Sequence, residues 1–307
     1  ANGVILVTTK KGQEGKTKVT FSNNTSFSTA LMTYDFQNTY GNAEGNATSW
    51  GDKLATPTTF DPAGFFNTGV NVINGLTFST GTAKNQTYAS VSTTNTTGII
   101  PNSEYNRYNF SFRNTAKFAN DKLTLDLGAQ YVIQNNKNMI GGGQYFNPIP
   151  ALYLFPRGEN FQEVQMYERW NSTRQIMEQY WPTSIYSTDI NMQNPYWIVN
   201  RMQTQTKKHR YMLNGSLKWD VTDWFNIIGR VRVDNTVQDA YDRRHASTSG
   251  TFTEGSINGF YGHSKQNDYA TYADVIANIN KTWEDWSLHV NVGGSIDDRN
   301  SNSAHFN

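Results

Sequence analysis

The residues that could carry out covalent chemistry are few and lie far apart in this sequence. The chain has no Cys, which excludes a thiol nucleophile and a Cys-ligated metal site. Asp297 and Asp298 are adjacent, but neighbours on a strand point to opposite faces and make a poor acid–base pair. The five histidines share no spacing typical of metal ligands: His209, His245, His263, His289 and His305. We therefore expect no enzyme, no catalytic residue, no metal site and no cofactor.

The composition indicates a folded chain that is polar overall but rich in aromatic rings. Hydrophobic residues make up 36% and the mean hydropathy is −0.65, yet aromatic residues reach 14%, which a disordered chain would lack. The net charge of +1 gives no field that would attract nucleic acid. No apolar run approaches the roughly 18 residues of a membrane helix, so a membrane crossing would have to use β-strands.

Strict alternation of apolar and polar residues is the strongest pattern in the chain. Leu125 and Leu127, for example, alternate with Asp126 and Gly128. A period of two over about a dozen residues predicts a long strand with one apolar face and one polar face. The same pattern predicts about nine antiparallel strands, and it is seen in residues 107–118, 123–134, 211–233 and 273–296, with weaker strands near 17–28, 76–80 and 86–93.

The connections between these strands alternate in length. Short turns are expected near Asn120, Thr222 and Glu284, whereas the connections after about residues 134 and 238 run to tens of residues. Phe and Trp residues flank the short turns. Long strands, alternating loop lengths and aromatic residues at the rim are typical of an outer-membrane barrel. A soluble β-sandwich also has alternating strands, but its strands usually run about five or six residues.

The long insert at about residues 136–200 is predicted to be a folded loop domain. Asn160 could cap a helix, with Glu163 reciprocating three residues later. Aromatic and apolar residues from Phe161 to Trp181 fall near helical spacing, and Pro182 would end that helix.

The opening residues 1–12 read as a strand that is apolar on both faces, from Val4 to Val7, followed by a polar exit at Lys10 and Lys11. This stretch resembles the end of the plug domain in SusC/RagA-type TonB-dependent outer-membrane transporters. Further stretches in the order typical of that family are residues 36–41, 65–69, 97–110 and 194–197.

The resemblance implies a fold class and a domain division. Residues 1–12 would end the plug domain, with Asn2 and Gly3 in the plug-exit motif. Residues 13–307 would form the first part of an all-β, antiparallel transmembrane barrel that closes with 22 strands in the whole protein. The loop domain at about 136–200 would be extracellular. The chain would then be a fragment, with the TonB-contacting segment and most of the plug outside it.

The resemblance also implies a function and partners. Such a protein sits in the bacterial outer membrane as a multi-pass barrel and imports a bulky nutrient, an oligosaccharide or a peptide, using the TonB complex. A SusD-like surface lipoprotein acts as its lid. Two alternatives remain open: a passive porin or adhesin barrel, and a secreted glycan-binding β-protein.

The aromatic rings of the insert are the candidate recognition residues. They could pack the core of the loop domain itself, an explanation that applies above all to the helix residues Trp170, Tyr180 and Trp181. They could also contact the lipoprotein lid, or stack on sugar faces. We expect the rings beside Gly or Pro and outside the helical pattern to contact lid or cargo: Tyr145, Phe146 and Trp197. Arg113 and Arg230, on the polar faces of their strands, would line the path.

Overall fold

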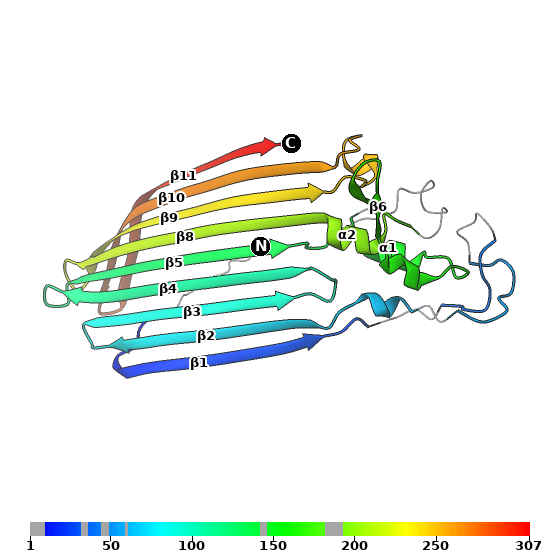
Figure 1. Cartoon of the computed structure of the whole chain (residues 1–307). Helices are drawn as coiled ribbons and strands as arrows, with labels where there is room; N and C mark the ends of the chain where they lie inside the picture. The colour runs from blue at the N-terminus through cyan, green and yellow to red at the C-terminus, as the bar shows by residue number, and fades with distance from the viewer. Residues whose placement is uncertain (1–9, 32–35, 44–48, 59–60, 142–145, 182–192) are drawn as a thin grey trace.

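The computed structural model describes residues 10–31, 36–43, 49–58, 61–141, 146–181 and 193–307. In this part of the chain, nine strands form one antiparallel sheet in which each strand pairs with the next along the sequence (Figure 1). The expected all-β fold and its nine strands are therefore confirmed. The strands are β1 (Gly15–Ser28), β2 (Gly69–Gly81), β3 (Asn85–Thr97), β4 (Glu104–Phe118), β5 (Leu123–Lys137), β8 (Met202–Asp220), β9 (Phe225–Arg244), β10 (Phe260–Trp283) and β11 (Trp286–Phe306).

Short turns join β2 to β3, β4 to β5, β8 to β9 and β10 to β11 at one end of the sheet, which we call the turn end (Figure 1). The helices lie at the other end, the loop end, where a short turn also joins β3 to β4. The turn between β4 and β5 carries positive φ angles at Ala119, Asn120 and Asp121. Glu284 does the same between β10 and β11. Rings surround the turn end, and each is at least 40% exposed: Phe118, Trp219, Trp224, Trp283 and Trp286.

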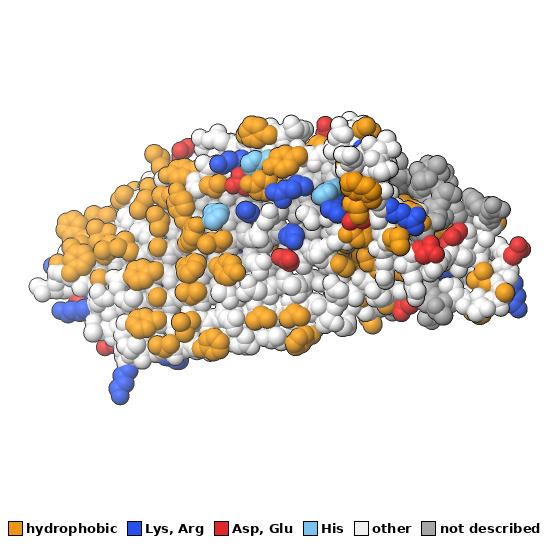
Figure 2. All heavy atoms as spheres, viewed as in Figure 1, with side chains coloured by type: hydrophobic (Ala, Val, Ile, Leu, Met, Phe, Trp, Pro, Cys, Tyr) orange, Lys and Arg blue, Asp and Glu red, His pale blue; other side chains and the backbone are white. Residues whose placement is uncertain are grey.

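The regular register sorts the side chains onto two faces. Ladder partners such as Phe112, Ala129 and Leu213 lie on one face, which we call the apolar face. Ser111 and Gln130 lie together on the other, the polar face. The register is interrupted only near Gly15 in the described part of β1, so the sorting holds across all nine strands. Figure 2 shows hydrophobic side chains spread over the strands.

The apolar face forms a band of defined height. On β8 it runs from Trp219 near the turn end to Tyr211, through Leu217 and Leu213. Eight residues at a rise of about 3.3 Å span about 26 Å along the strand. For a strand tilt of about 40° this length corresponds to a height of about 20 Å, close to the apolar band of about 25 Å that barrels present to lipid.

Aspartates paired with arginines hold neighbouring strands together on the polar face. Arg113 donates to Asp126 through Nε and Nη2, at 2.8 and 2.7 Å. The guanidinium of Arg230 makes the same kind of contact with Asp274, at 2.9 and 2.7 Å. Asp274 is 5% exposed, so the arginine supplies the counter-charge that a carboxylate in this position needs.

The segment before β1 crosses the polar face. The Nζ of Lys11 lies 3.4 Å from Asp126, and the backbone N–H of Gln13 donates to Ser79. A Cβ on Gly12 would lie 2.6 Å from the backbone nitrogen of Thr87, so only glycine allows this approach to β3. The expected plug-exit residues Asn2 and Gly3 lie outside the described residues.

Short helices and a hairpin form a layer at the loop end of the sheet (Figure 1). We call it the loop layer. One buried cluster joins Phe65, Leu152, Phe155, Val164 and Val199, and a second is centred on Trp197 and Phe252. The elements are η1 (Pro62–Phe65), α1 (Pro148–Tyr153), η2 (Phe161–Gln165), β6 (Glu168–Asn171), β7 (Ile176–Gln179), α2 (Pro195–Arg201) and η4 (Gly250–Phe252). None of the described helices is long and apolar enough to cross a membrane.

The expected helix from residue 161 to 181 is wrong. Asn160 does cap a helix, since its side chain accepts a hydrogen bond from the N–H of Gln162. The helix that follows is only the short η2. The side chain of Asn171 then accepts from the N–H groups of Thr173 and Arg174, a turn that competes with the helix. The chain therefore folds into the β6–β7 hairpin, where Trp170 is 61% exposed instead of packing the loop core.

The connection after β9 is shorter than expected. Strand β9 continues to Arg244 and β10 begins at Phe260, which leaves residues 245–259 between them. Both strands extend beyond the region of alternating hydrophobicity. Polar residues there, such as Gln238 and Asp242 on β9, still pair with residues of β10.

Candidate functional site

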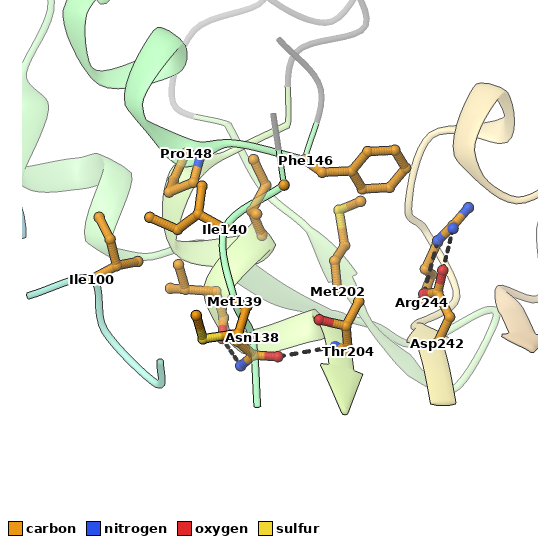
Figure 3. Close-up of a pocket in the computed structure, with 13 residues that line it drawn as sticks. Ile100, Asn138, Met139, Ile140, Phe146, Pro148, Met202, Thr204, Asp242 and Arg244 are labelled. Atoms are coloured by element: carbon orange, nitrogen blue, oxygen red, sulfur yellow. Dashed lines mark hydrogen bonds and ion pairs between the residues drawn. The ribbon is translucent and has the colours of Figure 1, made fainter. Parts of the chain in front are cut away.

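A pocket of about 260 Å³ lies where the loop layer meets the ends of β5, β8 and β9. We call it the loop-end pocket, and Figure 3 shows the residues that line it. By the strand register, Met202, Thr204, Asp242 and Arg244 lie on the polar face. The lining residues are Ile100, Asn138, Met139, Ile140, Gly141, Phe146, Pro148, Ile198, Val199, Met202, Thr204, Asp242 and Arg244.

The walls of the pocket are mainly apolar. Met202 and Ile198 belong to the buried cluster around Trp197, so the pocket floor is part of the loop-layer core. Phe146 is 40% exposed, and its ring meets the ring of Phe252 edge-on at 5.3 Å between centroids. In Figure 3 the ring of Phe146 lies above Met202. An exposed ring over an apolar floor offers a flat contact surface to a ligand.

One wall of the pocket carries charge. Arg244 is paired with Asp242 and also donates to the backbone carbonyl of Phe252. Its guanidinium lies 4.8 Å from the ring of Phe146 and 4.6 Å from that of Phe260, within cation–π range. The ion pair therefore holds the guanidinium of Arg244 against the ring of Phe146. The carboxylate of Asp242 lies beside the pocket and can accept hydrogen bonds.

The hydrogen bonds of Asn138 hold the wall of the pocket in place. Asn138, directly after β5, contacts two neighbouring segments. Its Oδ1 accepts from the N–H of Thr204 on β8 at 3.0 Å, and its Nδ2 donates to the carbonyl of Asn102, between β3 and β4, at 3.1 Å. Among the described residues, no group of three or more His, Asp or Glu could hold a metal ion. What the arrangement can do is bind: a ring, a hydrophobic wall and a paired charge suit a ligand with a flat apolar face and polar edges.

Asn194 fixes the shape of the loop layer around the pocket. It is fully buried, and Oδ1 accepts from the N–H of Tyr196 at 2.9 Å, which caps α2. Its Nδ2 donates to the carbonyls of Val164 and Tyr180, at 2.9 and 3.0 Å. One side chain thus ties together η2, the residue directly after β7 and α2, and Pro195 follows it at the first turn of the helix.

A second contact holds the hairpin to α2. Glu168 accepts two hydrogen bonds from Arg201, at 2.6 and 2.8 Å. These bonds raise the pKa of the Arg201 guanidinium above its ordinary value, because they favour its charged form. The pair joins β6 to the last turn of α2, immediately before β8 begins.

The predicted site residues fall in three different places. Phe146 lines the pocket, as described above, and Tyr145 lies outside the described residues. The expectation for Trp197 is not met: its side chain has no exposed surface, and Nε1 donates to the hydroxyl of Thr248 at 3.0 Å. Trp197 packs the loop-layer core because the cap at Asn194 turns it inward on α2.

Arg113 and Arg230 are not brought together with Phe146. Both lie on the polar face in the turn-end halves of their strands, where aspartates hold them. The sequence patterns did not point to the other pocket residues, among them Arg244, Asp242 and Met202. Asp242 and Arg244 stand two apart on the polar side of one strand, so extending the alternation of β9 beyond residue 238 could have found them.

A curated relative and solved structures agree on what this chain is similar to, although no protein-family model matches it. The TonB-dependent receptor SusC of Bacteroides thetaiotaomicron is 28% identical over 268 residues, which cover 83% of this chain and 25% of that protein. The SusC/RagA-type resemblance is confirmed. The chain thus spans about a quarter of the length of this curated relative.

Two solved structures of the RagAB peptide importer have the same fold. The open-open state matches with a TM-score of 0.60 and the closed-closed state with 0.63, each at 14% identity over 97% of this chain. The chain covers 39% and 40% of those proteins. The nine-stranded sheet is therefore similar to part of an all-β barrel of the SusC/RagA type.

Replacing Asn194 tests whether the loop layer depends on this one side chain. In Asn194→Ala the cap is lost, and the carbonyls of Val164 and Tyr180 lose their donor. The stability of the loop layer should therefore fall by about 2 kcal/mol more than in Asn160→Ala, which removes only an exposed cap. Protease should then cut within residues 138–201 about 30-fold faster in Asn194→Ala than in Asn160→Ala. Equal cutting rates in the two purified variants would contradict this role for Asn194.

Proposed function

We propose that this chain forms part of the wall and outer loops of a TonB-dependent importer that carries a bulky nutrient across the bacterial outer membrane. The observation that carries the proposal is the two-faced sheet, with an apolar band about 26 Å long along its strands on one face and paired charges on the other. The similarity to SusC supports the same function. The protein does no covalent chemistry; it binds and translocates.

The apolar face contacts lipid in this proposal and the polar face lines the lumen. A lipid-facing wall must be apolar because unpaired charge is costly at mid-membrane. In the described strands of the sheet, the ion-paired arginines lie on the other face. The segment at residues 10–13 crosses that polar face, which supports a plug on the lumen side. The turn end would be periplasmic and the loop end extracellular, where the loop layer meets the cargo.

The cargo class that the polar face favours is a neutral oligosaccharide. Hydroxyl and amide side chains dominate this face, as in the ladder of Thr77, Ser90, Ser111 and Gln130. The aspartates Asp126, Asp234 and Asp274 are each held by arginine, so these carboxylates are already paired within the sheet. A peptide is the second candidate, because the fold matches the RagAB peptide importer.

A SusD-like lipoprotein would sit on the loop layer as a lid. The loop layer has two buried clusters, but apolar side chains are also exposed on its surface, including Met166 at 53% and Trp170 at 61%. Exposed rings and methionines are enriched at interface cores. The TonB complex would act on the whole transporter through a segment outside the 307 residues.

Uptake by cells tests the transport function. Deleting the gene for the whole transporter should abolish growth on at least one oligosaccharide or peptide while leaving growth on its monomers unchanged. Uptake of that labelled cargo should stop when an uncoupler collapses the proton-motive force, because TonB-driven import needs it. Uptake that continues in the presence of the uncoupler would identify a passive porin instead.

Phe146 should set the affinity for cargo. In the whole transporter, Phe146→Ala removes a flat contact from the loop-end pocket, and we expect the cargo concentration at half-maximal uptake to rise about tenfold. Phe118→Ala is the matched control, since its ring is 44% exposed and lies at the turn end. Unchanged uptake in Phe146→Ala at parental outer-membrane levels would exclude the pocket as a cargo contact.

A further inference from the structure

A cluster of basic side chains lies on the apolar-face side of the sheet, toward the loop end. It consists of Lys207 on β8, Arg243 on β9 and Lys265 on β10, and we call it the basic cluster. The register places Lys207, Asp239 and Lys265 side by side in one ladder. Figure 2 shows Lys, Arg and His side chains gathered on this face, beyond the main field of hydrophobic side chains.

The height of the cluster relative to the apolar band is fixed by the strand. Lys207 stands four residues beyond Tyr211, which ends the band on β8. At a rise of about 3.3 Å this is about 13 Å along the strand, or about 10 Å above the band for a tilt of about 40°. That level lies in the polar headgroup region of a bilayer whose apolar core faces the band.

The charges of the cluster are not neutralised by the protein. Within the part of the chain that the structure describes, no carboxylate lies within 4 Å of the charged nitrogens of Lys207, Arg243 or Lys265. The one carboxylate in their ladder, Asp239, is held by Nε2 of His263 at 3.0 Å. Three cations around one carboxylate leave a net positive charge on the surface.

A stacked pair of rings forms the base on which these cations lie. The ring of Tyr241 stacks on that of His263 at 4.5 Å and 7°. The Nζ of Lys207 and the guanidinium of Arg243 lie 5.8 and 5.0 Å from the centre of the Tyr241 ring. Lys207 and Lys265 are exposed, so both ammonium groups can reach an anion outside the protein.

The surface below the cluster is suited to acyl chains. A shallow groove of about 540 Å³ runs over the apolar face and includes Tyr131, Tyr211 and Leu213. Its upper edge at Tyr211 is four residues from Lys207 on the same face of β8. A ligand that meets both surfaces needs an anionic head and an apolar tail.

We propose that the basic cluster binds the phosphates of a phosphorylated lipid headgroup in the outer leaflet, whose acyl chains lie on the apolar face. The proposal rests on the proposed function, because it needs the apolar face to contact lipid. Lys207 and Lys265 are two strands apart, about 10 Å between backbones, so their long side chains can bracket one phosphate. Basic side chains at the membrane surface attract anionic headgroups by charge alone, and the ring pair orders them here.

The test uses the whole transporter in nanodiscs of phosphatidylcholine doped with lipid A bisphosphate. The double variant Lys207→Gln, Lys265→Gln should bind lipid A at least tenfold more weakly than the parent, since it removes two surface charges. The control Lys84→Gln, Lys122→Gln removes two exposed charges at the turn end and should bind like the parent. Lipid bound per protein is measured by native mass spectrometry.

Two further arms identify what the cluster recognises. Dephosphorylated lipid A should bind the parent as weakly as the double variant binds the bisphosphate. Inorganic phosphate at millimolar concentration should not displace lipid A. Equal binding of the two lipid A forms, displacement by free phosphate, or an unaffected double variant would each overturn the proposal.

Failure of this proposal can be told apart from failure of the proposed function. A parent protein that enters the nanodiscs as a heat-modifiable barrel but binds no lipid A would contradict only the basic cluster. A parent protein that stays soluble without lipid would contradict the membrane barrel itself, and the cluster proposal with it.

Discussion

Unbroken register between neighbouring strands is the constraint on which the rest of this structure depends. A shift of one residue in any strand would move its apolar set to the polar face. Leu125 would then exchange places with Asp126, and the carboxylate would leave Arg113 for the apolar side. The cross-strand ion pairs and the apolar band are therefore two results of one pairing scheme, and each makes the wrong register costly.

The same register continues past the apolar band and creates both candidate sites. On the polar side it brings Met202 and Thr204 opposite Arg244 and Asp242, which form walls of the loop-end pocket. On the other side it aligns Lys207 with Lys265 across β9. Long strands that extend beyond the apolar core thus carry recognition surfaces on rigid backbone, while the loop layer supplies Phe146.

The sequence predicts those features that depend on neighbouring residues along the chain. It does not predict features that depend on contacts between distant residues. Alternation such as Leu125–Asp126–Leu127 reveals the strands, their faces and the short turns, because each follows from a period of two. The cap at Asn160 is also local. By contrast, the buried Trp197 donates a hydrogen bond to Thr248, about fifty residues away, and no local pattern could show this contact. The helix expected after Asn160 fails because the turn at Asn171 competes with a periodicity that suits a helix equally well.

The central claim, that the apolar face contacts lipid and the polar face does not, can be tested most directly on β5. Nitroxide labels are placed one at a time at positions 123–134 of the whole transporter in nanodiscs, and their collisions with oxygen and with a water-soluble nickel chelate are measured by electron paramagnetic resonance. We expect a period of two, with oxygen collisions highest at positions 125, 127 and 129 and low at 126, 128 and 130. Collision rates without alternation, or access of the nickel chelate to positions 125 and 127, would contradict it.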